Sequence, residues 1–377
     1  MTISALAQVT VREVSPVSAN NLVNAFVEPN VVLYSPEVVK RNKLVVMLAS
    51  KGDVPSDFYA FDSFAAKAGF HVIGLNYNSA PSAKEACDSK TDPACYENVR
   101  RQVILGDALV PDIQVDTNHF IVRRLKDLLV YLNKNTTDEN WGQFINQNGD
   151  IVWGNVIVAG HSEGATNAAY MGKLFKLDRV LCFAPVPEVM QYNKSMAPWV
   201  TSDGLTFQYN NYVFYQENDT QSFDSSFYKG IGYSEYGDKT YVEDFPYPFN
   251  LSRHLTTRFI SDHNHTITIK DDVTPFEPNG VSRFERVWAY MLTNEAFQGV
   301  SEFENEYLLY PNPCSDELNI QLKDESIELK WTILNSLGSI VLKGKGNNIK
   351  TGALKEGVYF VKLMSSKGMA LSRFVKN

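Results

Sequence analysis

The sequence is poor in positive charge, in long apolar runs and in histidine. No long cluster of Lys and Arg occurs and the formal net charge is −8, which argues against nucleic acid as a partner. No apolar stretch reaches the roughly eighteen residues that indicate a transmembrane helix, so we expect none. Only six histidines occur in 377 residues, so each can be considered individually.

Cysteine is equally scarce, with four in the chain: Cys87, Cys95, Cys182 and Cys314. Cys87 and Cys95 enclose a short polar loop, and no histidine or third cysteine stands beside them at the spacing of a metal site. In an exported protein this pattern predicts a local disulfide, whereas in a cytosolic protein the two would be free thiols. Cys182 lies in an apolar run, VLCFAPV, which predicts a buried core thiol.

The chain is long enough for about two domains, and its character changes near residue 300. Before that point, nearly continuous apolar segments alternate with helical patterns. This order predicts an α/β fold with a mostly parallel sheet flanked by helices. The predicted strands are 43–50, 71–77, 156–160, 180–186 and 211–217, and the clearest predicted helices are 117–133 and 281–294.

The remainder consists of short segments in which apolar and polar residues alternate, separated by Gly, Asn and Lys. This pattern predicts a small antiparallel β-sandwich of about seventy residues, and no histidine occurs in it. We therefore divide the chain into an N-terminal segment 1–19, an α/β domain 20–299, a linker 300–307 and a sandwich 308–377.

Residues 206–248 are dense in Tyr and Phe and contain one clear strand, NYVFYQE, followed by a loop pattern. Ligand pockets are lined mainly by apolar and aromatic side chains, so one interpretation is a wall of the substrate site. The other is that the rings only anchor surface loops. The composition favours neither.

The strongest chemical motif is Gly160-His161-Ser162-Glu163-Gly164. An apolar strand, VIVAG, runs into it, and an alanine-rich helical pattern follows it. A tight turn between strand and helix exposes a serine Oγ above a sheet, and the two glycines make room for the turn. The helix N-terminus adds N–H groups where an oxyanion would form. This context predicts that Ser162 is a nucleophile.

A serine nucleophile needs a base. Three histidines precede Ser162 or lie inside its motif and are interpreted as structural: His71, His119 and His161. Three follow it, in agreement with the Ser–acid–His chain order that accompanies such a turn: His254, His263 and His265. We favour His265, in the loop SDHNHT before the final helix, with His263 as a close alternative and His254 as a weaker one.

The base in turn needs a carboxylate that holds its tautomer. Asp219 is our choice because it lies just past the end of the strand NYVFYQE, on a loop. The alternatives are Glu217, Asp224 and, after the strand 180–186, Glu188.

An oxyanion would need two backbone N–H donors. We expect one from Glu163, directly after the nucleophile, and one from Lys51, in the loop after the strand 43–50.

Residues 20–297 resemble a bacterial α/β-hydrolase family of predicted secreted enzymes. The resemblance rests on NVVLYSPEV, LASKGDVPSDF, WGNVIVAGHSEGATNAAYMGKL and HTITIKDDVTPFEPNGVSRFERVWAYML. In that family a His stands ten residues before a Thr-Pro, an interval that here separates His265 from Pro275 and favours His265 over His263. The oxyanion loop of the family is richer in glycine than LASKGDVPS. This departure concerns the choice of Lys51 as an oxyanion donor and not the choice of Ser162 as the nucleophile. The resemblance implies ester or related acyl hydrolysis without a defined substrate.

Residues 308–377 resemble the C-terminal sorting domain of the type IX secretion system of Bacteroidetes. LLYPNPCSDELNI, LNSLGSIVLKG and LKEGVYFVKLMSSKGMALSRFVKN carry this resemblance. It implies export through the outer membrane to the medium or the cell surface, with the secretion machinery as a partner. Export also supports a Cys87–Cys95 disulfide and an interpretation of Ala5-Leu6-Ala7 as a signal-peptide remnant.

The leading hypothesis is a secreted carboxylic ester hydrolase that uses Ser162, His265 and Asp219 on a small-molecule or polymer ester, and requires no cofactor or metal. A peptidase or amidase with the same triad is the enzymatic alternative. A non-catalytic surface-binding protein that uses residues 206–248 is the third hypothesis, and the presence of all three triad residues argues against it.

Overall fold

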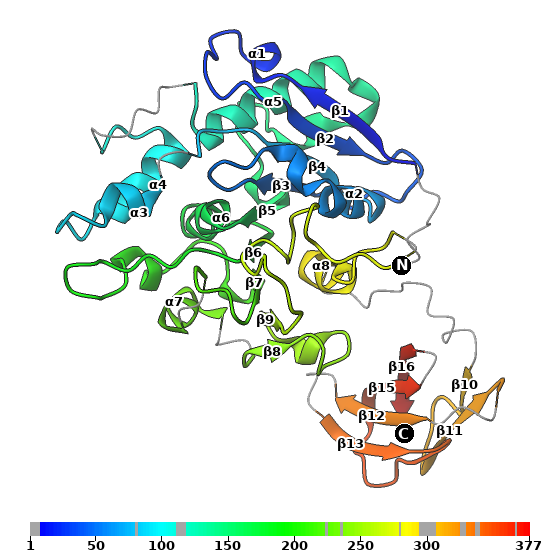
Figure 1. The fold of residues 1–377 in the computed structure, drawn as a ribbon. Helices are drawn as coiled ribbons and strands as arrows, with labels where there is room; N and C mark the ends of the chain where they lie inside the picture. Colours follow the sequence, from blue (N-terminus) through cyan, green and yellow to red (C-terminus); the bar gives the residue numbers. More distant parts are fainter. Residues whose placement is uncertain are drawn as a thin grey trace. The chain divides into compact units, whose positions relative to one another are not determined.

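The computed structural model describes residues 8–79, 82–110, 118–222, 225–233, 237–278, 280–293, 307–324, 329–335, 340–365 and 368–377. Within these ranges the chain forms two compact units, one in residues 8–293 and the other in residues 307–377. Each unit has its own hydrophobic core. Figure 1 shows both.

The first unit is built around a mixed sheet whose nine described strands have the order β1-β2-β4-β3-β5-β6-β7-β9-β8 (Figure 1). The strands are β1 (Thr10–Val14), β2 (Asn30–Tyr34), β3 (Leu44–Leu48), β4 (His71–Leu75), β5 (Val156–His161), β6 (Arg179–Phe183), β7 (Asn211–Gln216), β8 (Thr240–Tyr241) and β9 (His254–Thr257). β2 pairs antiparallel with β1 and β4, whereas the pairs from β4 to β8 are parallel. The unit therefore has the predicted α/β class.

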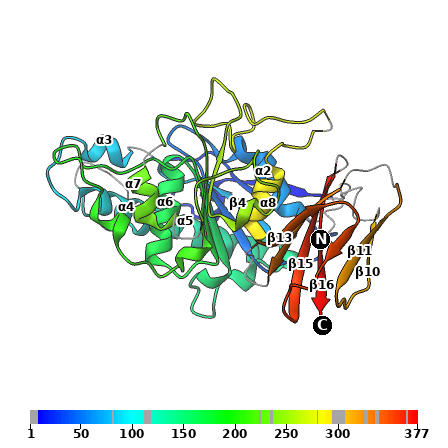
Figure 2. The same ribbon diagram turned by 90° about the horizontal axis from the view of Figure 1, so that it is seen from below.

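Helices cover both faces of this sheet (Figure 2). α2 (Tyr59–Lys67) and α8 (Glu285–Thr293) lie on one face, and α4 (Cys95–Leu105), α5 (Ile121–Asn135) and α6 (Glu163–Leu174) lie on the other. The shorter helices are α1 (Pro16–Ala19), α3 (Ala83–Cys87) and α7 (Ser225–Ile231). Turns of 3₁₀ helix occur at Pro55–Phe58, Thr137–Glu139, Trp141–Phe144, Trp153–Asn155, Pro198–Thr201, Gln208–Asn210 and Phe249–Leu251.

Coverage of both faces explains the apolar strands. Phe61 of α2 lies edge-on to Phe183 of β6, with ring centroids 5.4 Å apart, and also contacts Trp288 of α8. The neighbouring residue of β6, Cys182, belongs to the core that the sheet shares with α4, α5 and α6. Strands buried on both faces need apolar side chains at successive positions, and β3 is buried throughout.

Some elements differ from the sequence predictions. Residues 10–14, inside the predicted N-terminal segment, form β1 at the edge of the sheet, where exposed and half-buried positions alternate. Residues 1–7, which include Ala5-Leu6-Ala7, lie outside the described residues. Between β7 and β9, where only a loop pattern was predicted, the chain also forms α7 and β8. These short elements have no clear periodicity in the sequence.

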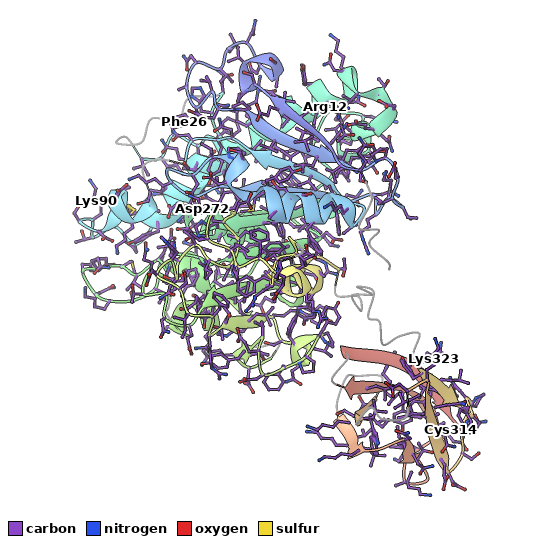
Figure 3. All side chains as sticks on the ribbon, turned by 45° about the vertical axis from the view of Figure 1, so that its right-hand side comes forward. Arg12, Phe26, Lys90, Asp272, Cys314 and Lys323 are labelled. Carbon is purple, nitrogen blue, oxygen red and sulfur yellow. A yellow bond between two sulfur atoms is a disulfide. The ribbon has the colours of Figure 1, made fainter. Side chains whose placement is uncertain are left out.

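The predicted disulfide between Cys87 and Cys95 is present and lies close to Lys90 (Figure 3). Cys87 ends α3 and Cys95 begins α4, so the bond ties the two helices together. Cys182 is buried on β6, and its thiol lies 3.3 Å from the carbonyl oxygen of Ala165, as expected of a core thiol.

The second unit is all-β. One antiparallel sheet contains β10 (Tyr307–Tyr310), β11 (Glu317–Leu322) and β14 (Asn348–Lys350), and the other contains β13 (Ile340–Lys345), β12 (Lys330–Asn335), β15 (Gly357–Ser365) and β16 (Gly368–Lys376). Leu318 and Ile320 of the first sheet share one core with Ile333, Val361 and Phe374 of the second. Two sheets around one core make a sandwich. Of the predicted linker 300–307, only residue 307 is among the described residues.

Candidate active site

Ser162 lies at the junction of β5 and α6. β5 ends at His161, α6 begins at Glu163, and Ser162 between them has φ +54° and ψ −117°. A positive φ is uncommon for residues other than glycine, so the surrounding fold must hold it. The N–H of Ser162 donates to the carbonyl oxygen of Phe183, at the end of β6, over 2.9 Å.

The two glycines of the motif allow other segments to pass close to the turn. A Cβ atom at Gly160 would lie 2.3 Å from the carbonyl oxygen of Gly164. A Cβ atom at Gly164 would lie 2.2 Å from the carbonyl oxygen of Leu48, at the end of β3. Both distances are far below any non-bonded contact, so a side chain at either position would force β5, α6 and β3 apart.

The Oγ atom of Ser162 is the first member of a hydrogen-bonded chain. Nε2 of His265 lies 2.7 Å from Ser162 Oγ, and Nδ1 of His265 lies 2.8 Å from Oδ2 of Asp219. Ser162, Asp219 and His265 follow β5, β7 and β9. Because these strands run in the same direction, their carboxyl ends meet at one edge of the sheet, and the three side chains converge there.

Asp219 is held as a carboxylate, although it is only 2% exposed. Burial raises the pKa of Asp219, but hydrogen bonds from His265, Ser222 and the N–H of Gln221 outweigh burial and keep the pKa below its ordinary value. The N–H of Gln221 lies 2.9 Å from Oδ1 of Asp219. A charged Asp219 favours a proton on Nδ1 of His265, which leaves Nε2 able to accept the Ser162 proton.

Four of the other histidines take no part in this hydrogen-bonded chain. His254 is buried on β9, with its Nε2 atom 3.0 Å from the hydroxyl of Tyr215, and burial lowers its pKa to about 4. His263 is exposed in the loop that carries His265. His71 is buried at the start of β4, and His119 is buried just before α5.

The alternative acids are also placed differently from Asp219. Glu188 is buried, and its Oε1 atom lies 2.5 Å from Nη2 of Arg100. Glu217 is half-buried directly after β7. Asp224 lies outside the described residues.

His161 belongs to a second His–Asp pair, beside the first. Its Nε2 atom donates to the carbonyl oxygen of His265 over 2.9 Å, and its Nδ1 atom lies 3.4 Å from Oδ2 of Asp53. Lys270 also pairs with Asp53, with Nζ and Oδ1 2.8 Å apart. Burial raises the pKa of Asp53, but His161 and Lys270 outweigh burial and keep it below its ordinary value. These contacts join the loop after β3 to the turn at Ser162 and to the loop of His265.

The predicted oxyanion donors are backbone groups. Glu163 is the first residue of α6, and the first N–H groups of a helix have no acceptor within the helix. Lys51 lies in a turn after β3, and its ammonium group forms an exposed ion pair with Glu85, with Nζ and Oε1 2.5 Å apart. The roles of both N–H groups stay predictions.

The aromatic region 206–248 has described segments at both ends of β7. Residues 206–210, which include the 67% exposed Phe207, precede β7 and lie at the edge opposite to Ser162. Residues 217–222 follow β7 and lie at the edge where Asp219 and Ser162 meet. The strand between them is buried in the sheet.

Comparisons with known proteins concern the second unit. Residues 308–377 match the family model described as the secretion system C-terminal sorting domain. This domain shows that the protein is exported through the outer membrane by the type IX system and is secreted or attached to the cell surface. No curated protein matches the chain.

Two further features of the described residues concern membranes and metals. No helix among them is long and apolar enough to cross a membrane. No group of three or more His, Cys, Asp or Glu side chains among them is arranged to hold a metal ion.

Proposed function

We propose that the first unit has the α/β-hydrolase fold and is a carboxylic ester hydrolase with Ser162 as its nucleophile. The hydrogen-bonded chain from Ser162 Oγ through His265 to Asp219 is the observation that carries the proposal. The strand–turn–helix setting of Ser162 and the Ser, Asp, His order along the chain support it. The sorting domain shows that the protein is exported, so the proposed activity would act on substrates outside the cell.

In the acylation step, Oγ of Ser162 attacks the acyl carbon of the ester while its proton moves to Nε2 of His265. The charged carboxylate of Asp219 stabilises the imidazolium that forms. The C–O bond to the alcohol then breaks, and the alcohol leaves with the proton from Nε2. The product of this step is an acyl ester on Ser162.

Deacylation repeats the sequence with water. His265 takes a proton from water, the hydroxide attacks the acyl carbon, and the proton returns to Oγ of Ser162 as the acid leaves. In both steps the negative oxygen of the tetrahedral intermediate needs fixed donors. The N–H groups of Glu163 and Lys51 are assigned this role.

Replacement of the nucleophile tests the proposal. Ser162→Ala should lower kcat/KM for p-nitrophenyl butyrate by roughly 10⁴-fold or more, because the acyl-enzyme cannot form. A fluorophosphonate probe should label the wild-type protein at Ser162, and peptide mass spectrometry locates the label.

Ser222→Ala is the matched control because Oγ of Ser222 lies 3.3 Å from Nδ1 of the same imidazole, on the side away from the nucleophile. This variant should keep its labelling and lose no more than about tenfold in rate, the effect of one auxiliary hydrogen bond. Full activity in Ser162→Ala, or a label on another residue, would refute the proposal.

A further inference from the structure

Arg100 is a buried arginine of α4 that binds the beginning of α6. Its side chain is 1% exposed, and Nη1 lies 3.0 Å from Oε1 of Glu163 and 2.7 Å from Oδ1 of Asn167. Nε and Nη2 both donate to Oε1 of Glu188, in the loop after β6. One guanidinium group thus holds two successive turns of α6 and the loop that follows the neighbouring strand.

The carboxylate of Glu163 is also held from a second direction. Its Oε1 atom accepts the backbone N–H of Ala83, at the start of α3, over 2.8 Å. Because the Cys87–Cys95 disulfide joins α3 to α4, Ala83 and Arg100 belong to one tied segment. A buried carboxylate that lost these partners would be left unpaired at a high cost, so Glu163 is confined to this position.

The peptide between Ser162 and Glu163 is the group that this arrangement fixes. Its N–H is the proposed oxyanion donor, and a donor is effective only when it is already aimed at the developing charge. The positive φ of Ser162 is not an intrinsically favoured conformation, so outside contacts must maintain it. A Glu163 side chain fixed at its end restrains its own Cα atom and therefore the plane of the preceding peptide.

We propose that Arg100 is a positioning residue of the oxyanion site, which acts through the carboxylate of Glu163 to aim the Glu163 N–H. This inference rests on the proposed function. Arg100 stays protonated although it is buried. Burial lowers its pKa, but the carboxylates of Glu163 and Glu188 outweigh burial and hold the pKa above its ordinary value. Arg100 therefore offers Glu163 a permanent cation.

Glu188 provides a matched control because it binds the same guanidinium but is not bonded to the nucleophile peptide. Glu163→Ala should lower kcat for p-nitrophenyl butyrate by about 100-fold, with KM changed by less than about threefold, as when an oxyanion donor is lost. Glu163→Gln keeps the acceptor oxygen and should stay within about fivefold of the wild-type kcat. Glu188→Ala should lower Tm at least as much as Glu163→Ala and keep kcat within about threefold.

Arg100→Lys tests the arginine itself, because lysine keeps the charge and loses the planar fork. We expect kcat to fall by about tenfold or more in the wild-type and Glu188→Ala backgrounds. In the Glu163→Ala background, Arg100→Lys should lower kcat by less than about threefold, because the carboxylate through which Arg100 acts is already absent.

Equal losses of kcat in Glu163→Ala and Glu188→Ala would show that Arg100 serves stability alone and would overturn the inference. If Arg100→Lys does not fold, that comparison of the two glutamate variants decides the matter. The assays use full-length protein in which Ser162 is labelled by the fluorophosphonate. Activity that did not depend on Ser162 would refute the proposed function and this inference together, whereas Ser162-dependent activity with equal glutamate effects would refute only the inference.

Discussion

Two His–Asp pairs flank Ser162, and their atoms correspond. Nδ1 of His265 lies 2.8 Å from Oδ2 of Asp219, and Nδ1 of His161 lies 3.4 Å from Oδ2 of Asp53. The pairs differ at the other ring nitrogen. Nε2 of His265 meets the hydroxyl of Ser162, whereas Nε2 of His161 meets the carbonyl oxygen of His265. A hydroxyl can give up a proton and a carbonyl cannot, so only the first pair is equipped for proton transfer.

The carboxylates of the two pairs also differ in what they serve. Asp219 accepts hydrogen bonds from the imidazole of His265, from Ser222 and from the N–H of Gln221. Asp53 is shared between His161 and the ammonium group of Lys270. The second pair therefore joins loops. The group that Nε2 of each histidine contacts distinguishes the two pairs, although both contain the same residue types.

The largest difference between the pairs should appear when each histidine is removed. His265→Ala should lower kcat by roughly 10⁴-fold or more, because the proposed mechanism then has no base for Ser162. His161→Ala should lower kcat by about tenfold, because it removes one hydrogen bond that holds the backbone of His265. Single-turnover kinetics with p-nitrophenyl butyrate measures both. Comparable losses would remove the distinction between a proton-transfer pair and a bracing pair.

The carboxylates should show the same contrast on a smaller scale. Asp219→Asn should lower kcat by about 10³–10⁴-fold, because a neutral amide no longer selects the tautomer with the proton on Nδ1 or stabilises the imidazolium. Asp53→Asn keeps an acceptor oxygen for Lys270, and we expect less than a tenfold loss. kcat at saturating substrate, with Tm as a folding control, checks this. An Asp53→Asn effect as large as that of Asp219→Asn would contradict the assignment.

What the sequence alone could predict depended on how local each signal is. The turn at Ser162 is contained in one stretch of strand, turn and helix, and its glycines leave a mark because no side chain fits at either position. His265 could be selected because the chain has few histidines and because the order of the strands brings the loops that follow them close together. The sandwich strands follow directly from alternation of apolar and polar residues.

The contacts that hold the site have no such signal. Asp53 pairs with Lys270, which lies 217 residues further along the sequence, and Arg100 pairs with Glu188, 88 residues further along. Each residue alone resembles an ordinary surface charge. His161 occupies the variable position of the motif, and only the fold shows that its ring reaches the backbone of His265. Long-range polar pairs of this kind are decided by the packing of loops, which periodicity and spacing do not encode.

A third histidine differs from His265 and His161 because its charged neighbour is a cation. His254 faces the cation of Lys239, and burial together with this charge lowers its pKa to about 4 from 6.5. Between these values the unfolded chain binds a proton that the folded chain does not, so stability falls as the pH drops from 6.5 to 4. Urea unfolding should show the wild type losing about 2 kcal/mol more than His254→Gln between pH 7 and 4.5.

The comparison with His254→Gln is needed because other groups titrate in the same interval. Burial raises the pKa of Asp271 to about 6, so its folded form takes up a proton first and gains stability as the pH falls, opposite to His254. Asp219 and Asp53, with pKa values below the ordinary 3.8, lose their contributions only at still lower pH. Glutamine keeps a polar partner for the hydroxyl of Tyr215 and does not titrate. Parallel curves for the two proteins would mean that His254 is protonated in the folded state, and that burial beside Lys239 does not keep it neutral.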